Sequence, residues 1–299
     1  MSDGPQEICC RVCGAHEIYC CGSHVRILEE GVTALTEPLV KSCPLHEILH
    51  GTKKVDAKTV QNSVGKKIQD FGFCCRDRCF DPDPQVAYGA SEMMNVWLER
   101  GFIDCAVVVC EGAGTVLTSN GKLVQGIGAR LTGIIKTSPI LGTIEHVEHC
   151  GGVVLDKTVA RIDQVAGVKR AFSLGFKHIA VSIAGFQARA INGIRNFEKS
   201  SKADVLVFSV CNTRVSKADV KHVAKADVVC ASASTILRKE IGPNALLQVG
   251  VTIPVYALTQ RGKDLVLAYL SVFKDKLVAF RTTQLPYEVR GKGPKLKSS

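Results

Sequence analysis

Residues 177–210 read KHIAVSIAGFQARAINGIRNFEKSSKADVLVFSV, which is an apolar run, a helical stretch and a second apolar run. Further apolar runs stand at 103–110, 151–155, 226–232 and 253–259, and helical stretches separate most of them. Strands that alternate with helices predict a mostly parallel sheet with helices on both faces. Right-handed crossovers would make this α/β sheet Rossmann-like. We therefore expect an α/β fold of this kind for the body of the protein.

A smaller unit rich in cysteine is expected in front of this sheet. The stretch HVRILEEGVTALTEP at 24–38 alternates apolar and polar residues around a turn, which predicts a β-hairpin. A short helix is expected at 43–51 and an amphipathic helix at 55–72, and a third helix is expected at 85–101. The chain then divides into three predicted parts: 1–50 with the hairpin, 51–150 with a Gly-rich turn, and 151–299 with a basic tail.

Composition and charge exclude several function classes. The chain has 299 residues with a net charge of +10, and its first residues show neither a signal peptide nor a membrane-spanning run. We expect a soluble, cytoplasmic protein without a membrane partner. Aromatic residues make up 6% and Trp97 is the single tryptophan, so a base-stacking platform and a nucleic-acid partner are not expected. The basic tail at 290–299 is expected to be a solvated end, with a docking arm as the alternative.

Cysteine is the most informative residue type, because nine of the fourteen cysteines fall within the first 79 residues. In a reducing cytoplasm such density indicates metal, redox or catalytic chemistry rather than structural disulfides. The stretch CCRVCGAHEIYCCGSH at 9–24 contains a C-x-x-C pair and a second doublet. The predicted metal ligands are Cys10, Cys13, Cys20 and Cys21 in a first site, and Cys43, Cys74, Cys75 and Cys79 in a second site or completing the first. Thiolates suit both zinc and an iron–sulfur cluster, and the sequence does not distinguish these cofactors.

A second kind of site is predicted at the carboxyl ends of the strands, where α/β sheets bind their ligands. The stretch CEGAGT at 110–115 contains glycines that would let backbone N–H groups approach an anion, although a tight turn explains them equally well. The predicted cofactor-binding residues are Glu111, Gly112, Gly114, Thr115, Arg130, Arg161 and Asp163. Asp163 has a helix cap as its alternative role. Three strand-end cysteines, Cys110, Cys211 and Cys230, predict a pocket lined by thiols.

Several motifs together resemble one family. They are CPL at 43–45, DFGFC and DR within 70–78, VVVCEGAGTV at 107–116, LVQGIGARLTG at 123–133, KTSPI at 136–140 and VLDKTVARIDQV at 154–165. In this order they resemble methanogenesis marker protein 8, a family of methanogenic archaea, over most of residues 24–185. The resemblance implies a cytoplasmic role in methanogenesis. By association with other marker proteins, it implies methyl-coenzyme M reductase or its activation components as partners.

Three functions stay open at this point. The first is a metal-binding or iron–sulfur accessory protein that assists maturation or activation of methyl-coenzyme M reductase. The second is an enzyme acting on a small anionic ligand or nucleotide at the strand ends. The third is a non-catalytic docking module of a larger methanogenesis complex.

Overall fold

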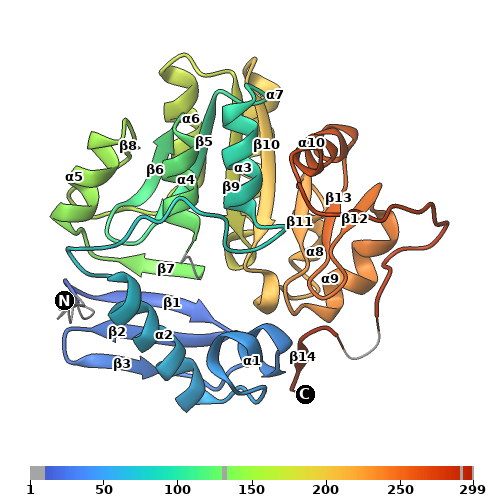
Figure 1. The fold of residues 1–299 in the computed structure, drawn as a ribbon. Helices are drawn as coiled ribbons and strands as arrows, with labels where there is room; N and C mark the ends of the chain where they lie inside the picture. Colours follow the sequence, from blue (N-terminus) through green and yellow to red (C-terminus); the bar gives the residue numbers. More distant parts are fainter. Residues whose placement is uncertain (1–10, 130–132, 290–291, 298–299) are drawn as a thin grey trace.

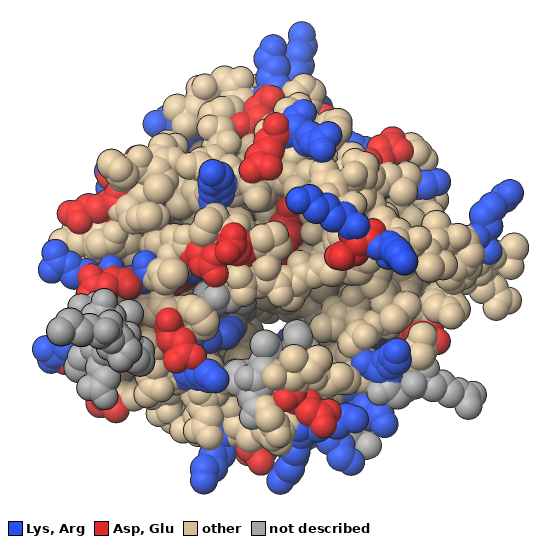
Figure 2. All heavy atoms as spheres, in the orientation of Figure 1, with Lys and Arg blue, Asp and Glu red and all other residues tan. Residues whose placement is uncertain are grey.

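The computed structural model describes residues 11–129, 133–289 and 292–297. A large eight-stranded sheet lies between two layers of helices, and a smaller four-stranded sheet packs at one end of it (Figure 1). The face shown in Figure 2 is hollowed between these two parts, and acidic and basic side chains are interspersed over it. On the described residues, no helix is both long and apolar enough to cross a membrane.

The large sheet confirms a mostly parallel α/β architecture. Its strands, in spatial order, are β12 (Leu247–Val249), β13 (Val255–Ala257), β11 (Val228–Cys230), β10 (Asp204–Val210), β9 (His178–Ala184), β5 (Cys105–Cys110), β6 (Gly114–Thr118) and β8 (Val153–Val154). The central strands β5, β9, β10 and β11 are parallel. Strands β6 and β13 run in the opposite direction, and β8 and β12 each pair antiparallel to one of them.

The two flanks differ from the expected pattern. The apolar run at 253–259 forms β13, which is antiparallel to its neighbours, because β12 and β13 are joined by a short hairpin. The strands β5 and β6 are likewise joined by three residues, and a parallel crossover needs a dozen or more. The four central strands follow one another in chain order, without the reversal that forms the ligand crevice of dinucleotide-binding folds. The Rossmann-like detail is therefore not confirmed.

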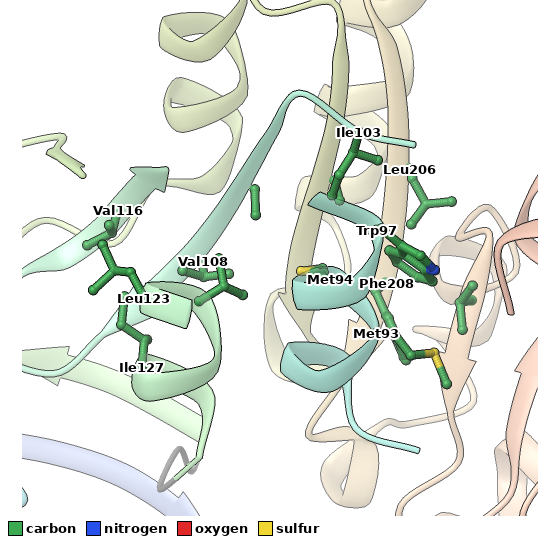
Figure 3. Packing of buried hydrophobic residues seen from close by; sticks show 14 of the residues in the cluster. Met93, Met94, Trp97, Ile103, Val108, Val116, Leu123, Ile127, Leu206 and Phe208 are labelled. Atoms are coloured by element: carbon green, nitrogen blue, oxygen red, sulfur yellow. The ribbon is translucent and has the colours of Figure 1, made fainter. Parts of the chain in front are cut away.

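Alternate residues of the central strands build two cores, one on each face of the sheet. One face is covered by α3 (Ala90–Glu99), α4 (Gly121–Gly128), α5 (Leu141–His149) and α10 (Gln260–Leu270). The other is covered by α6 (Gln164–Ser173), α7 (Ala190–Ser200), α8 (Val220–Val223) and α9 (Thr235–Glu240). In Figure 3, Met94 and Trp97 of α3 point toward sheet residues such as Val108 and Phe208. The sheet is therefore buried on both faces, as its continuous apolar runs predicted.

Helix α3 begins five residues later than the pattern at 85–101 predicted. The carboxylate of Glu92 accepts hydrogen bonds from the backbone N–H groups of Gln85 (3.0 Å) and Val86 (3.2 Å). These N–H groups therefore bond to a side chain at the start of the helix, and residues 85–89 form a loop.

The N-terminal layer is an antiparallel sheet of β3 (Gly31–Ala34), β2 (Ser23–Leu28), β1 (His16–Cys20) and β7 (Gly133–Thr137). The predicted hairpin is confirmed, since Leu28 of β2 pairs with Gly31 of β3 across a two-residue turn. Strand β7 comes from the predicted segment 51–150 and pairs with β1, so elements of two predicted segments share this sheet. The three-part division of the chain stays a prediction.

Two predicted helices complete the N-terminal layer. Helix α1 (Pro44–His50) ends at Gly51, which has a left-handed backbone. Helix α2 (Ala57–Phe71) begins after Asp56, which forms a capping box with Thr59, and it packs on β2 and β3. Both helices confirm the sequence prediction.

The described part of the basic tail packs against the N-terminal layer. Strand β14 (Lys295–Leu296) pairs antiparallel with β4 (Val40–Ser42). The backbone N–H of Lys297 donates to the Leu39 carbonyl at 2.7 Å, and its ammonium lies 2.9 Å from the Glu37 carboxylate. The expectation of a freely solvated tail is therefore wrong for residues 295–297, because an unpaired edge strand was available to them.

Candidate functional site

Two adjacent cysteines form the tip of the hairpin between β1 and β2. Cys20 is the last residue of β1 and pairs with Ser23, so Cys21 and Gly22 make a two-residue turn. Their φ angles are 51° and 79°. A turn of this kind favours Asn and Gly, because a positive φ is uncommon for residues with a Cβ atom. Cys21 therefore occupies a strained position for its residue type.

Two neighbouring central strands, β10 and β11, also have cysteines at their carboxyl ends. Cys230 ends β11, and Cys211 follows β10 with a φ of 52°. Asn212 joins the two strand ends, since its side-chain amide donates to the Cys230 carbonyl at 2.7 Å. Its backbone N–H donates to the Ser232 hydroxyl at 3.0 Å, and Ser232 also has a positive φ. The strand ends are thus fixed by side-chain hydrogen bonds.

Cysteines from distant parts of the chain meet between the N-terminal layer and these strand ends. Electrostatic interactions link Cys21 with Cys43, and Cys211 with both Cys20 and Cys230. We call this group the seam thiols. All five are free, without a disulfide.

The seam thiols differ in acidity. A hydrogen bond from the Cys21 thiol and the nearby Lys67 ammonium lower the pKa of Cys20 to about 7, although burial opposes this shift. The same hydrogen bond raises the pKa of Cys21. Burial raises the pKa of Cys211 to about 12. The lowered pKa favours the thiolate form of Cys20 near neutral pH, and thiolates attack electrophiles and bind metals.

Close packing holds the N-terminal layer against the strand ends. A Cβ atom on Gly133 of β7 would lie 3.5 Å from the Cys211 Cβ atom and closer still to Phe186. The Arg214 guanidinium donates to the Gly22 carbonyl at 2.6 Å and lies 4.6 Å from the centre of the Tyr19 ring. Arg214 thereby ties the strand-end region to the cysteine turn.

A cavity of about 240 Å³ lies beside the seam thiols. Its walls come from the amino end of α3, from α4 and from the carboxyl ends of β9 and β10. Ser182, Val210 and Cys211 line it, and they also line an adjoining space of about 20 Å³. A cavity thus lies at the edge of the sheet where ligands were predicted to bind, and the strand-end residue Cys211 forms part of its wall.

The two predicted cysteine clusters are regrouped in the structure. Cys13 donates its backbone N–H to the Cys74 carbonyl at 2.9 Å, and Val12 bridges to Cys75, so Cys13 lies with the second cluster. Cys79 is exposed. Within residues 11–129, 133–289 and 292–297, no group of three or more His, Cys, Asp or Glu side chains is arranged to hold a metal ion. Cys10 and Arg130, both predicted site residues, lie outside the described residues.

Glu111 forms a buried ion pair with Arg78, and each side chain is 1% exposed. The Arg78 guanidinium also donates to the carbonyls of Gly126 (2.9 Å) and Ile127 (3.1 Å). Burial and the Glu111 carboxylate raise the pKa of Cys74 well above its usual value. The sequence singled out Glu111, but no local signal paired it with Arg78.

The glycines after β5 lie in a hairpin turn and not at the amino end of a helix. Gly112 and Gly114 have φ angles of 78° and 71° and connect β5 directly to β6. A Cβ atom on Gly114 would lie 2.2 Å from the Ala160 carbonyl oxygen. A tight turn and a close backbone approach therefore account for both glycines.

The remaining predicted cofactor residues make contacts that organise the start of α6. The Thr115 hydroxyl accepts from the Asp163 N–H and donates to Gln164, both at 2.8 Å. The Asp163 carboxylate caps α6 by accepting from the Ala166 N–H. Arg161 is exposed. The alternative role of Asp163 as a helix cap is confirmed.

Comparisons with known proteins identify the family. The family model described as "Uncharacterized protein conserved in archaea (DUF2099)" matches residues 16–271. The chain is 38% identical over 256 residues to "Uncharacterized protein MJ0054" of Methanocaldococcus jannaschii, covering 84% of this chain and 89% of that protein. Among solved structures, a chain of a NiFe hydrogenase complex from Methanosarcina barkeri is similar at 12% identity and a TM-score of 0.34, over 61% of this chain and 72% of that chain. The protein therefore belongs to the archaeal family DUF2099.

Proposed function

We propose that this protein binds a soft metal ion or an iron–sulfur cluster through the seam thiols and acts as an accessory protein of methanogenesis. The observation that carries the proposal is an acidic thiol, Cys20, within electrostatic reach of thiols from separate parts of the chain. Thiolates prefer zinc, copper(I) and iron–sulfur clusters. The motif resemblance to methanogenesis marker protein 8 supports a role in maturation or activation of methyl-coenzyme M reductase.

Backbone strain at the seam also supports this proposal. Five non-glycine residues of the described chain have a positive φ, and three of them, Cys21, Cys211 and Ser232, lie at the seam. Strained backbone persists only where surrounding structure holds it, and it clusters at functional sites. Because the described thiols form no closed ligand set, metal binding would require their side chains to turn toward a common point.

Metal and sulfide analysis of anaerobically purified protein tests the proposal. We expect bound zinc, or iron with acid-labile sulfide, that is lost in the variant Cys20→Ser/Cys211→Ser. Cys105→Ser is the matched control, because Cys105 is a buried free cysteine at the start of β5, away from the strand ends. A folded protein without metal would contradict the proposal, and so would equal metal content in all three proteins.

Action on a small ligand is a second candidate function, and the cavity at the strand ends is the observation that favours it. Glu111, Arg130, Arg161 and Asp163 were expected to act on an anion. Arg130 lies outside the described residues, and the other three are not among those that line this cavity. No specific observation favours the docking-module alternative, since the described end of the basic tail pairs with β4.

A further inference from the structure

The walls of the 240 Å³ cavity are mainly apolar. They come from five elements and the loop before α3, and the larger apolar side chains are Val86, Met94, Val108, Val124, Ile127 and Val210. Cavities of this composition bind apolar molecules and fix their orientation with a few polar groups.

One hydroxyl in the cavity has no hydrogen-bond partner among the described residues. Ser182 is 7% exposed and lines both the cavity and the adjoining space. Its carbonyl accepts from Gln164 at 2.9 Å, but its hydroxyl makes no hydrogen bond with any residue that the structure describes. Buried polar groups are nearly always hydrogen-bonded, so this hydroxyl is available to a ligand. Ser182 lies at a predicted strand end, but the sequence gave no signal that set it apart.

The charges around the cavity disfavour charged ligands. Among the described residues that line it, Glu92 is the only charged one, and none is lysine, arginine or histidine. The Glu92 carboxylate accepts from the N–H groups of Gln85 and Val86, from the Gln125 amide at 3.2 Å and from the Ser91 hydroxyl at 3.0 Å. An anion would therefore meet a carboxylate without a cation, and a cation would find that carboxylate occupied by protein donors.

The cavity volume sets the ligand size. An apolar protein cavity of about 150 Å³ accommodates benzene, which has six heavy atoms. By proportion, the cavity of about 240 Å³ accommodates roughly ten heavy atoms. We propose that it is a binding site for an uncharged, mostly apolar organic molecule of this size, with its polar end on the Ser182 hydroxyl and one side against Cys211.

Isothermal titration with three isosteric probes tests the charge and the class of the ligand. The probes are para-methylbenzyl alcohol, para-methylbenzoate and para-methylbenzylammonium, which share one apolar ring and differ in charge. We expect saturable binding of the alcohol and at least about tenfold weaker binding of the two ions, since each ion loses its hydration in the cavity. The proposal is overturned if either ion binds as tightly as the alcohol, or if no probe binds.

Substitutions of residues that line the cavity test whether the alcohol binds inside it. Ser182→Ala is expected to weaken binding of the alcohol by about three- to tenfold, the range of one hydrogen bond. Ala90→Phe, at the half-buried start of α3, is expected to fill the cavity and abolish binding. Ser173→Ala is the control, because its exposed hydroxyl bonds within its own helix. Unchanged affinity in both cavity variants, with native thermal unfolding, would contradict the site.

The proposed ligand site and the proposed metal site can be tested independently of each other. Cys20→Ser is expected to remove bound metal and to leave the affinity for the alcohol unchanged, because Cys20 does not line the cavity. Loss of alcohol binding in this variant would show that the probe depends on the seam thiols, and it would overturn the cavity as an independent site.

Discussion

The buried ion pair between Arg78 and Glu111 gives the sharpest stability prediction. Both side chains are 1% exposed, and the guanidinium also donates to the carbonyls of Gly126 and Ile127. Arg78→Met keeps much of the side-chain volume but leaves a buried carboxylate without its cation. Breaking a buried pair in this way costs about 3–5 kcal/mol, a large part of the ~5–15 kcal/mol that stabilises a typical domain.

Urea unfolding measures this loss directly, since the single tryptophan, Trp97, is fully buried and reports unfolding by fluorescence. The double variant Arg78→Met/Glu111→Leu is expected to recover at least about half of the lost stability, because no unpaired charge remains. Lys157→Met, which breaks an exposed pair, serves as the control and should change stability little. A loss below ~1 kcal/mol in Arg78→Met would refute the buried-charge argument, as would a double variant no more stable than the single one.

Three other predictions concern ionisation, capping and the tight turn. Lys67→Met should raise the pKa of the Cys20 thiol above about 7, so its thiolate absorbance, measured as the difference from a Cys20→Ser variant, appears at higher pH; an unchanged pH profile would contradict this. Asp163→Ala should cost about 1 kcal/mol in urea unfolding, whereas Asn at this position keeps the capping oxygen and should cost little. Gly114→Ala should destabilise more than Gly151→Ala, since both residues have a positive φ but only the first would clash. Equal unfolding midpoints for the two alanine variants would disprove that clash.

Local signals predicted individual elements well. The left-handed residue Gly51 ends α1 and the cap Asp56 precedes α2, close to the ends of the predicted ranges 43–51 and 55–72. The direction of the flanking strands was not predictable from apolar runs alone, because pairing depends on the length of the connection. The turn at 111–113 is too short for a crossover, so β5 and β6 had to be antiparallel.

The two predicted cysteine sites stay a prediction, but the structure places some of their members apart. Nearness in sequence placed Cys13 with Cys20, but the intervening β1 is extended, and a five-residue strand spans roughly 16 Å. Cys13 therefore reaches Cys74 while Cys20 interacts electrostatically with Cys211. Of the three strand-end cysteines predicted to line a pocket, Cys211 lines the cavity, whereas Cys110 and Cys230 are not among its described lining residues.

The pairing of β14 with β4 constrains the order in which the molecule is assembled. During synthesis the chain emerges from its amino end. Cys20 and Cys43 are therefore made long before Cys211, and also long before β14, which pairs with β4. Pairing of such distant segments is slow, because a long loop must close first. We therefore expect the seam to form late in folding, with its thiols accessible before the last strand pairs. Pulsed alkylation during refolding should therefore find Cys20 protected after the helices of the body have formed.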